Sequence, residues 1–256
     1  MTTTRWSELT TQLRERIALG DVGPAGELDS EAALGQRYGV SRVTVRRALE
    51  LLRDEGLVSS RRGAGWFVTT PSFHQQLALG SFRHAASAVD EAGGSASRRV
   101  VGFDFRSAPA PIASLLGLGE DTGVLHSRSV RSVDATPLDL ATEWIPAGLA
   151  GAISRADAEG RGIWQTLQAH GNVVETVRQT VTAGVAQHAD AEVLGVPAGA
   201  ALLLVRRLAI DPDGRPLALS DHRYLAHRFS LEVEFHGWTA AGPAETPGLR
   251  VVGDGS

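Results

Sequence analysis

One stretch of the chain, YGVSRVTVRRAL at residues 38–49, decides the fold of the N-terminal part. Gly39 ends a short helix, and Ser41 is a good N-cap for the helix predicted over residues 42–55. Gly56 then stands where a C-terminal glycine is common. Four apolar residues recur at helical spacing and predict the buried side of this helix: Val45, Ala48, Leu49 and Leu52.

The segments around this helix complete a small domain. Ser30 can cap a helix over residues 31–38, and an earlier apolar stripe predicts a helix that ends at Gly20. Two short strands, residues 57–60 and 66–69, are separated by RRGAG, whose glycines permit a tight hairpin. The stripe of the first helix consists of Trp6, Leu9, Leu13 and Ile17. Three helices and a hairpin with a basic tip predict a winged helix-turn-helix.

The other face of the predicted 42–55 helix carries cations. Arg42, Arg46 and Arg53 share one side of the helix because they are four and seven residues apart. An arginine early in a recognition helix can bind guanine bidentately, and one at a hairpin tip can bind phosphate. For any single arginine, a surface salt bridge is the alternative. The predicted DNA contacts are Ser41, Arg42, Thr44, Arg46, Arg47, Arg61, Arg62 and Gly63.

The charge distribution supports a division into two parts. The 256 residues carry 25 basic side chains, all arginine, and 29 acidic ones, for a net charge of −4. Residues 37–62 hold seven arginines and three acids, a local charge of +4, which leaves −8 on the rest. This pattern is typical of a DNA-binding head joined to another module, although a solvated arginine-rich helix has the same charge.

The composition excludes several kinds of chemistry. The chain has no cysteine, so disulfides, thiol nucleophiles and thiolate-bound zinc are excluded. Its eight histidines are scattered, and it lacks a phosphate-binding loop, a nucleophile elbow and an HExxH motif, so we expect no metal and no cofactor. No apolar run approaches the ~20 residues of a membrane span, and the first residues are polar, so we expect a cytoplasmic protein without membrane attachment.

The N-terminal sequence resembles the DNA-binding domain of GntR-family repressors. The resemblance rests on LDSE at 28–31, the 38–49 stretch, EGLV at 55–58 and GAGWFV at 63–68. It implies that Arg42 and Arg46 contact bases and phosphates, that Thr44 contacts the DNA backbone, and that Gly63 is the wing glycine. Ala32 stands where the family often has a basic residue, so one phosphate anchor is missing.

The rest of the chain predicts a second domain. We place the head at residues 1–70, a linker at 71–76, the second domain at 77–236 and a flexible tail at 237–256. Strands are expected over 98–107, 123–133, 138–145, 173–185, 200–211 and 216–225, and helices over 110–116, 163–170 and 187–194. Strand blocks interleaved with a few helices predict an α+β domain around one antiparallel sheet.

Several phrases of this second domain resemble the UTRA ligand-binding domain of the HutC subfamily, which has a chorismate-lyase-like fold. They are IASLLG at 112–117, RSVRSVDATPLDLATEWIP at 128–146, IWQTL at 163–167, AEVLGV at 191–196 and DGRP at 213–216. The resemblance implies a small-molecule effector in a cleft beside the sheet. It also implies a homodimer whose two heads bind a pseudo-palindromic operator in double-stranded DNA.

The effector-binding residues of that family are only partly kept. Arg131 matches one arginine of the family's pair, Ser129 stands in place of the other, and Ala141 and Ala218 replace two glutamates. The loss of these charged residues favours an anionic or aromatic effector that is less polar than an amino-sugar phosphate. The predicted effector contacts are Phe82, Arg83, Ser129, Arg131, Trp144, Trp164, Arg178 and Tyr224. Core packing is the alternative for the aromatic residues, and a position on the sheet surface is the alternative for Arg178.

These observations predict a sequence-specific DNA-binding transcriptional regulator, with a repressor released by its effector as the expected form. An enzyme related to the lyase fold and a ligand-free architectural DNA binder are the alternatives. The basic head and the lack of an evident acid–base pair argue against an enzyme. The length of the second domain argues against a purely architectural protein.

Overall fold

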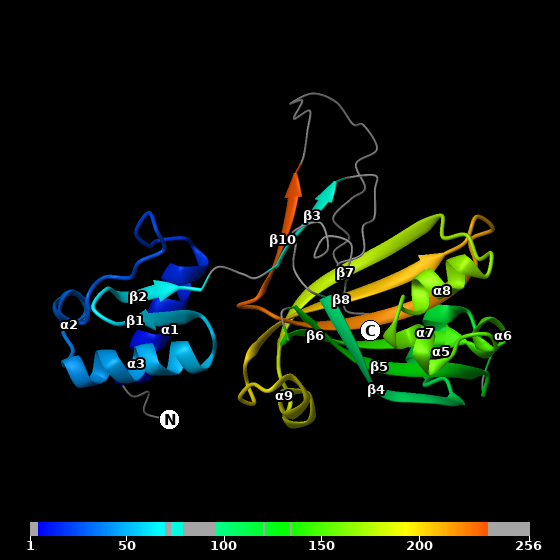
Figure 1. Ribbon diagram of the computed structural model, residues 1–256, viewed down its shortest axis with the longest axis horizontal. Helices are drawn as coiled ribbons and strands as arrows, with labels where there is room; N and C mark the ends of the chain where they lie inside the picture. The colour runs from blue at the N-terminus through cyan, green and yellow to red at the C-terminus, as the bar shows by residue number, and fades with distance from the viewer. Residues whose placement is uncertain (1–4, 70–72, 79–95, 120, 134, 235–256) are drawn as a thin grey trace, which may run out of the picture.

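The computed structural model describes residues 5–69, 73–78, 96–119, 121–133 and 135–234, and these form a helical head and a domain built on a sheet (Figure 1). The head contains α1 (Arg5–Ala18), α2 (Glu31–Tyr38), α3 (Arg42–Asp54) and a hairpin of β1 (Val58–Arg61) and β2 (Gly65–Val68). The predicted winged helix-turn-helix is confirmed, with each boundary within one or two residues of its expected place.

Local hydrogen bonds explain why the two short helices begin where they do. The Ser30 hydroxyl accepts from the backbone N–H of Ala33, and the Ser41 hydroxyl accepts from that of Thr44, each at 3.2 Å. The buried stripe of α3 then packs against α1 and the hairpin. The core of the head comprises Leu9, Leu13, Leu28, Leu34, Val45, Ala48, Leu49, Leu52 and Val58.

A six-stranded sheet, entirely antiparallel, forms the second domain. Its strand order is β4-β5-β6-β9-β8-β7. The strands are β4 (Ala96–Ser107), β5 (Gly123–Val133), β6 (Thr136–Pro146), β7 (Thr176–Val185), β8 (Ala201–Ile210) and β9 (Pro216–Leu225). The predicted α+β class with one antiparallel sheet is therefore confirmed.

Helices cover both faces of this sheet. Figure 1 shows α5 to α8 grouped at one end of the strands and α9 near the other end. The bounds are α5 (Ala110–Leu116), α6 (Ala147–Ala150), α7 (Arg155–Glu159), α8 (Ile163–Ala169) and α9 (His188–Leu194). Residues of α6, α7 and α8 pack with Leu125 and Ile145, whereas α5 and α9 pack with the oppositely directed Val124 and Leu140. Because side chains alternate along a strand, α6–α8 and α5/α9 lie on opposite faces.

Two strands absent from the sequence prediction form a separate parallel pair. They are β3 (Phe73–Ala78) and β10 (Phe229–Glu234), paired in register from Phe229 with Phe73 to Glu234 with Ala78. β3 overlaps the predicted linker at 71–76, and the predicted tail at 237–256 lies outside the described residues. The short helices α6 and α7 were also not predicted.

The head and the sheet domain touch at Gly56, just after α3. The ring of His227, in the turn between β9 and β10, lies so near that a Cβ at Gly56 would be 2.5 Å from it. Gly56 also has a φ of +78°, which glycine adopts without strain. Burial, helped by the charge of Arg228, lowers the pKa of His227 to about 4. The ring is therefore neutral near pH 7.

Candidate functional sites

The exposed face of α3 presents the predicted DNA-contacting side chains to solvent. Ser41, Arg42 and Arg46 are exposed, and Thr44 is half-buried with its hydroxyl 2.9 Å from that of Ser41. Val43 is 78% exposed between these polar residues. An apolar side chain exposed to water on the first turn of a recognition helix can contact a thymine methyl, so Val43 is a candidate contact that the sequence prediction did not include.

Glu31 holds Arg46 against the head. The Arg46 guanidinium is 2.8 Å from Glu31 Oε2 and donates a second bond, of 3.3 Å, to Oε1. The same Oε1 accepts from the Trp66 indole N–H at 3.3 Å, so Glu31 ties α3 to the hairpin. The bond with Arg46 lowers the pKa of Glu31, which keeps it charged at neutral pH. An exposed pair of this kind is weak, so a phosphate or a guanine can compete for Arg46.

The remaining arginines of the head have different environments. Arg61 lies over the ring of Phe67 at 4.3 Å, next to the exposed Arg62 and Gly63 at the hairpin tip. Arg47 lies over the ring of Trp6 in α1 at 4.6 Å. The hairpin tip thus keeps its cations exposed, while Arg47 is anchored on the side of α3 that faces α1.

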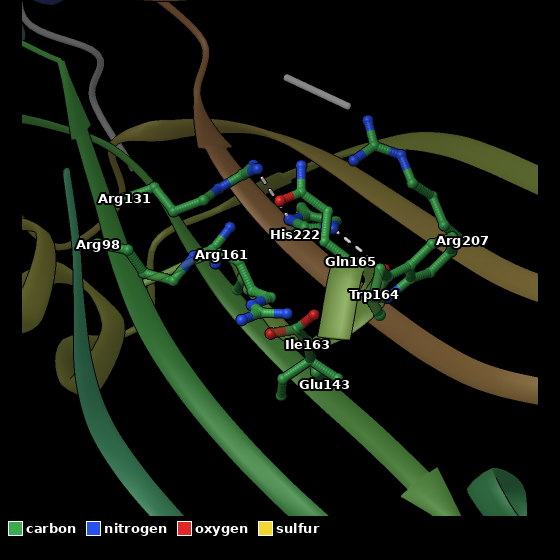
Figure 2. A pocket seen from close by; sticks show the side chains of 12 residues that line it. Arg98, Arg131, Glu143, Arg161, Ile163, Trp164, Gln165, Arg207 and His222 are labelled. Atoms are coloured by element: carbon green, nitrogen blue, oxygen red, sulfur yellow. Dashed lines mark hydrogen bonds between the residues drawn. The ribbon is translucent and has the colours of Figure 1, made fainter. Parts of the chain in front are cut away.

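A pocket lies on the sheet face that packs against α8. The lining residues come from five strands, from the segment that leads into α8 and from the first turn of α8: Arg98, Arg131, Ala141, Glu143, Arg161, Gly162, Ile163, Trp164, Gln165, Arg207, Ser220 and His222. Figure 2 shows Arg98, Arg131 and Arg161 entering from one side and Arg207 from the other. Four arginines and one carboxylate give the lining a positive charge, which favours an anionic ligand.

A buried ion pair forms the floor beside this pocket. Arg131 donates two bonds to Asp139, of 2.6 and 2.7 Å, and a third bond of 2.7 Å to the Tyr224 hydroxyl. His222 Nδ1 is 3.0 Å from Asp139, and its Nε2 is 3.1 Å from the Ser220 hydroxyl. Asp139 and Tyr224 are fully buried. Charge-assisted bonds of this geometry fix β5, β6 and β9 against one another.

The protonation of this cluster follows from burial and charge. Burial alone would raise the pKa of Asp139, but the Arg131 charge and the bond with His222 lower it to about 2. Burial, with the charges of Arg207 and Arg131, lowers the pKa of His222 to about 3. The neutral ring donates from Nδ1 to Asp139 and accepts from Ser220 at Nε2.

Arg98 enters the pocket through a space that only glycine leaves open. Gly162, at the start of α8, has a φ of +88°, and a Cβ there would be 2.1 Å from an Arg98 nitrogen. Arg98 donates to the carbonyl of Ala158 at 3.1 Å, which fixes part of its guanidinium. Arg161 makes no hydrogen bond or ion pair with any other described residue, so its donors remain available to a ligand.

The structure brings together only part of the predicted effector set. Arg131 and Trp164 line the pocket, and Tyr224 supports it from below through Arg131. Ser129 faces the same side of the sheet, since its register partner is Ala141, and its buried hydroxyl has no hydrogen-bond partner among the described residues. The predicted Phe82 and Arg83 lie outside the described residues.

Two predicted effector residues lie on the opposite face of the sheet. Trp144 packs with Ile112 and Leu116 of α5, its ring 4.3 Å from that of His126. Arg178 pairs in register with Leu208, which belongs to that same cluster. Neither side chain lines the arginine-rich pocket, because a shift of one residue along a strand turns a side chain to the other face, and a role for either in effector binding stays a prediction.

The prediction missed most of the polar lining of the pocket. Glu143, Arg98, Arg161, Arg207 and His222 all line it. One signal was available for the carboxylate: Asp139, Ala141 and Glu143 alternate along a single strand, so they share a face.

No group of three or more histidine, aspartate or glutamate side chains among the described residues is placed to hold a metal ion. Within the same residues, no helix has the length and apolar character to span a membrane.

Comparisons with known proteins match both parts of the chain. A family model described as "UTRA domain" matches residues 91–230, and one described as "Bacterial regulatory proteins, gntR family" matches residues 7–68. The HTH-type transcriptional repressor NagR of Bacillus subtilis is 26% identical over 226 residues, 88% of this chain and 91% of that protein. The HTH-type transcriptional repressor PhnF of Mycolicibacterium smegmatis is 25% identical over 230 residues, 90% and 91% of the two chains.

A solved structure has the same fold. The crystal structure of PhnF from Mycobacterium smegmatis superposes with a TM-score of 0.60, at 23% identity, over 89% of this chain and 99% of that one. The arrangement of a helical head before an antiparallel sheet domain is therefore shared with a protein of known structure.

Replacing Asp139 should unfold the sheet domain far more easily than replacing an exposed aspartate. Asp139→Ala leaves the Arg131 charge buried without its carboxylate, and we expect a loss of about 3–5 kcal/mol in the free energy of unfolding. Asp213→Ala is the matched control, because the Asp213–Arg215 pair is largely exposed. Urea titrations of the two variants measure the difference, and similar losses in both would contradict a structural role for the buried pair.

Acid should weaken the domain through His222. Its folded pKa of about 3 lies below the ordinary value of 6.5, so the unfolded chain takes up a proton first and stability falls as pH decreases from about 6.5 towards 3. His222→Gln removes this contribution and should flatten the stability profile over that range. Thermal unfolding at a series of pH values measures it, and parallel profiles for the variant and the natural chain would refute the assignment.

Proposed function

We propose that this protein is a homodimeric repressor of the HutC subfamily and that its effector releases it from its operator. The chain belongs to the GntR family of bacterial regulatory proteins that carry a UTRA domain. It is therefore a DNA-binding transcriptional regulator and not an enzyme. The observation that carries the proposal is the exposed cationic face of α3 beside a hairpin with a basic tip. The names of two relatives, both called transcriptional repressors, support the expected sign of regulation.

We assign base recognition to the first turns of α3. Arg42 and Arg46 are exposed on one side of the helix. When a guanine base replaces Glu31 as the partner of Arg46, the guanidinium can form two hydrogen bonds to that base. Arg61 and Arg62 at the hairpin tip then bind phosphate and position the head without reading sequence.

The effector of this proposal is an anion that binds in the arginine-lined pocket. Arg98 and Arg161 offer guanidinium groups there, and Trp164 supplies an aromatic wall. Arg207 adds positive charge to the lining, while its guanidinium donates to Gln179 and to the Tyr224 hydroxyl. In this proposal, strand β9 connects the effector pocket to the DNA-binding head. Ser220 and His222 of β9 line the pocket, and His227 follows the same strand and contacts Gly56 behind α3. A ligand that shifts β9 therefore alters the support of the recognition helix.

The free edge of the sheet supports a dimer. At the β4 edge, Arg155 and Glu159 of α7 bind the backbone of Val100 and so occupy part of that edge. At the other edge, no strand of the described chain pairs with the outer side of β7. β7 has one charged residue in ten, Arg178, and exposes Val181 and Val185. Two β7 edges can pair antiparallel about a two-fold axis and bury those unpaired backbone groups.

Replacement of Arg46 should remove sequence recognition. Arg46→Ala is expected to weaken binding to an operator selected from random DNA by about 1–3 kcal/mol, roughly five- to 150-fold, while folding is retained. Arg61→Ala is the comparison: it should weaken binding to every sequence and reduce the salt dependence by about one unit. Footprinting and salt titrations measure both effects. An unchanged footprint with Arg46→Ala would refute the assigned recognition face.

A charge at the centre of β7 should separate the dimer. Val181→Lys places two like charges near the two-fold axis, and we expect at least about a tenfold rise in the dimer dissociation constant, measured by light scattering. Because the chain has no cysteine, single cysteines at Thr180, Val181 or Thr182 can also report the pairing by disulfide cross-linking. Phe105→Cys, exposed on β4, is the control that should stay uncrosslinked. If Phe105→Cys forms a disulfide-linked dimer and Val181→Lys leaves the dimer intact, the interface lies at the β4 edge.

A further inference from the structure

Glu143 is a buried carboxylate that opens into the effector pocket without a partner. Its side chain lines the pocket and is 8% exposed. Within the described chain, no hydrogen bond or ion pair reaches its carboxylate. Its neighbours in register are Ser127 on β5 and Ser220 on β9, and the Ser220 hydroxyl is engaged by His222. The acceptor capacity of Glu143 is therefore unmet.

An unmet buried carboxylate is costly to the fold. Burial raises the pKa of Glu143, although the charges of Arg98 and Arg131 oppose the rise. Arg131 already gives two bonds to Asp139, so it cannot also neutralise Glu143 at short range. Asp139, four residues earlier on the same face of β6, is a buried carboxylate with a structural role, and it is paired with Arg131. Glu143 has no equivalent support.

The pocket around Glu143 is otherwise cationic. Arg98, Arg161 and Arg207 line it together with Glu143, and Figure 2 shows their side chains around the same hollow. A bare anion gains from the arginines but is repelled by the Glu143 carboxylate. An anion that also carries a hydroxyl or an ammonium group satisfies both, because its donor meets Glu143 while its charge meets the arginines.

We propose that Glu143 is the specificity-determining residue of this pocket and selects small anions that carry a hydrogen-bond donor, such as hydroxy acids, amino acids or hydroxylated or aminated phosphate esters. The proposal rests on the proposed effector function and names the chemical class of the effector. It replaces the less polar effector expected from the sequence, because that expectation followed from the loss of carboxylates at positions 141 and 218. Glu143 restores a carboxylate on the same strand face.

Matched ligand series test this assignment on the full chain without DNA. One series is succinate, malate and aspartate, and the other is propyl phosphate, glycerol 3-phosphate and phosphoethanolamine. Within each series the first ligand has no hydrogen-bond donor, the second carries a hydroxyl and the third carries an ammonium group. The size of the ligand and its anionic groups stay nearly the same. We expect the donor-bearing members of at least one series to bind about tenfold or more tightly than its apolar member, as measured by thermal shift and calorimetric titration.

Variants of Glu143 then identify the residue and the donor. Glu143→Leu should abolish the preference for donor-bearing ligands and tighten binding of the apolar member, because the repulsion is gone. Glu143→Gln keeps an acceptor oxygen but loses the charge, so it should retain most of the affinity for a hydroxyl and lose that for an ammonium. Glu192→Gln, exposed on α9, is the control and should leave every affinity unchanged.

The stability of the ligand-free chain gives a readout that separates ligand selection from a structural role. Glu143→Gln should raise the melting temperature, since it removes an unpaired buried charge. The increase in melting temperature should grow as pH rises above 4.5, the ordinary pKa of glutamate. Above that pH the unfolded chain loses the Glu143 proton more readily than the folded chain, whose pKa is raised, so the natural protein loses stability and the Gln variant does not. A lower melting temperature would instead indicate that Glu143 stabilises the fold through Arg98.

The outcomes that overturn the proposal are distinct from those that overturn the proposed function. Equal binding of apolar and donor-bearing anions, binding of neither, or a preference that survives Glu143→Leu would each refute the role of Glu143. Operator binding that ignores a ligand selected by Glu143 would refute effector control and leave the assignment of Glu143 intact.

Discussion

The Arg131–Asp139 ion pair is the interaction on which the sheet domain depends. It is buried, bidentate and extended by Tyr224 and His222, so it joins β5, β6 and β9 by bonds that burial makes strong. Because a partner removed from such a pair leaves an uncompensated charge, the three strands have little freedom to slide. The pocket beside them is consequently formed before any ligand arrives, which lowers the ordering cost of binding.

Burial divides the charged groups of this molecule into fixed and exchangeable sets. Asp139 and Glu143 lie four residues apart on one face of β6, yet the first is paired with an arginine and the second has no ion pair with a described residue. In the head, Arg46 and Glu31 form a pair of 2.8 Å in which Arg46 is exposed and Glu31 half-buried, so DNA can replace it at small cost. The same chemical pairing therefore serves as a permanent tie in the sheet and as a replaceable contact on α3.

Local signals account for what the sequence could predict. The helix at 31–38 and the strands at 123–133 and 216–225 were placed to the residue, because caps, glycines and alternation lie within each segment. The pocket was harder, since its residues come from five strands and no local pattern joins Arg98 to Arg207. Trp144 illustrates the limit: it is adjacent to Glu143, and only the register of β6 decides which of the two side chains faces the pocket.

The path from pocket to DNA has a definite energetic limit. An effector can shift the heads only by the difference between its affinities for the two arrangements of the molecule. Its bonds must therefore change when β9 moves. Ser220 and His222 meet this condition, since they line the pocket and belong to the strand that leads to His227. At Gly56 a side chain would collide with the His227 ring, so the contact is close enough to transmit a displacement of β9 to the end of α3.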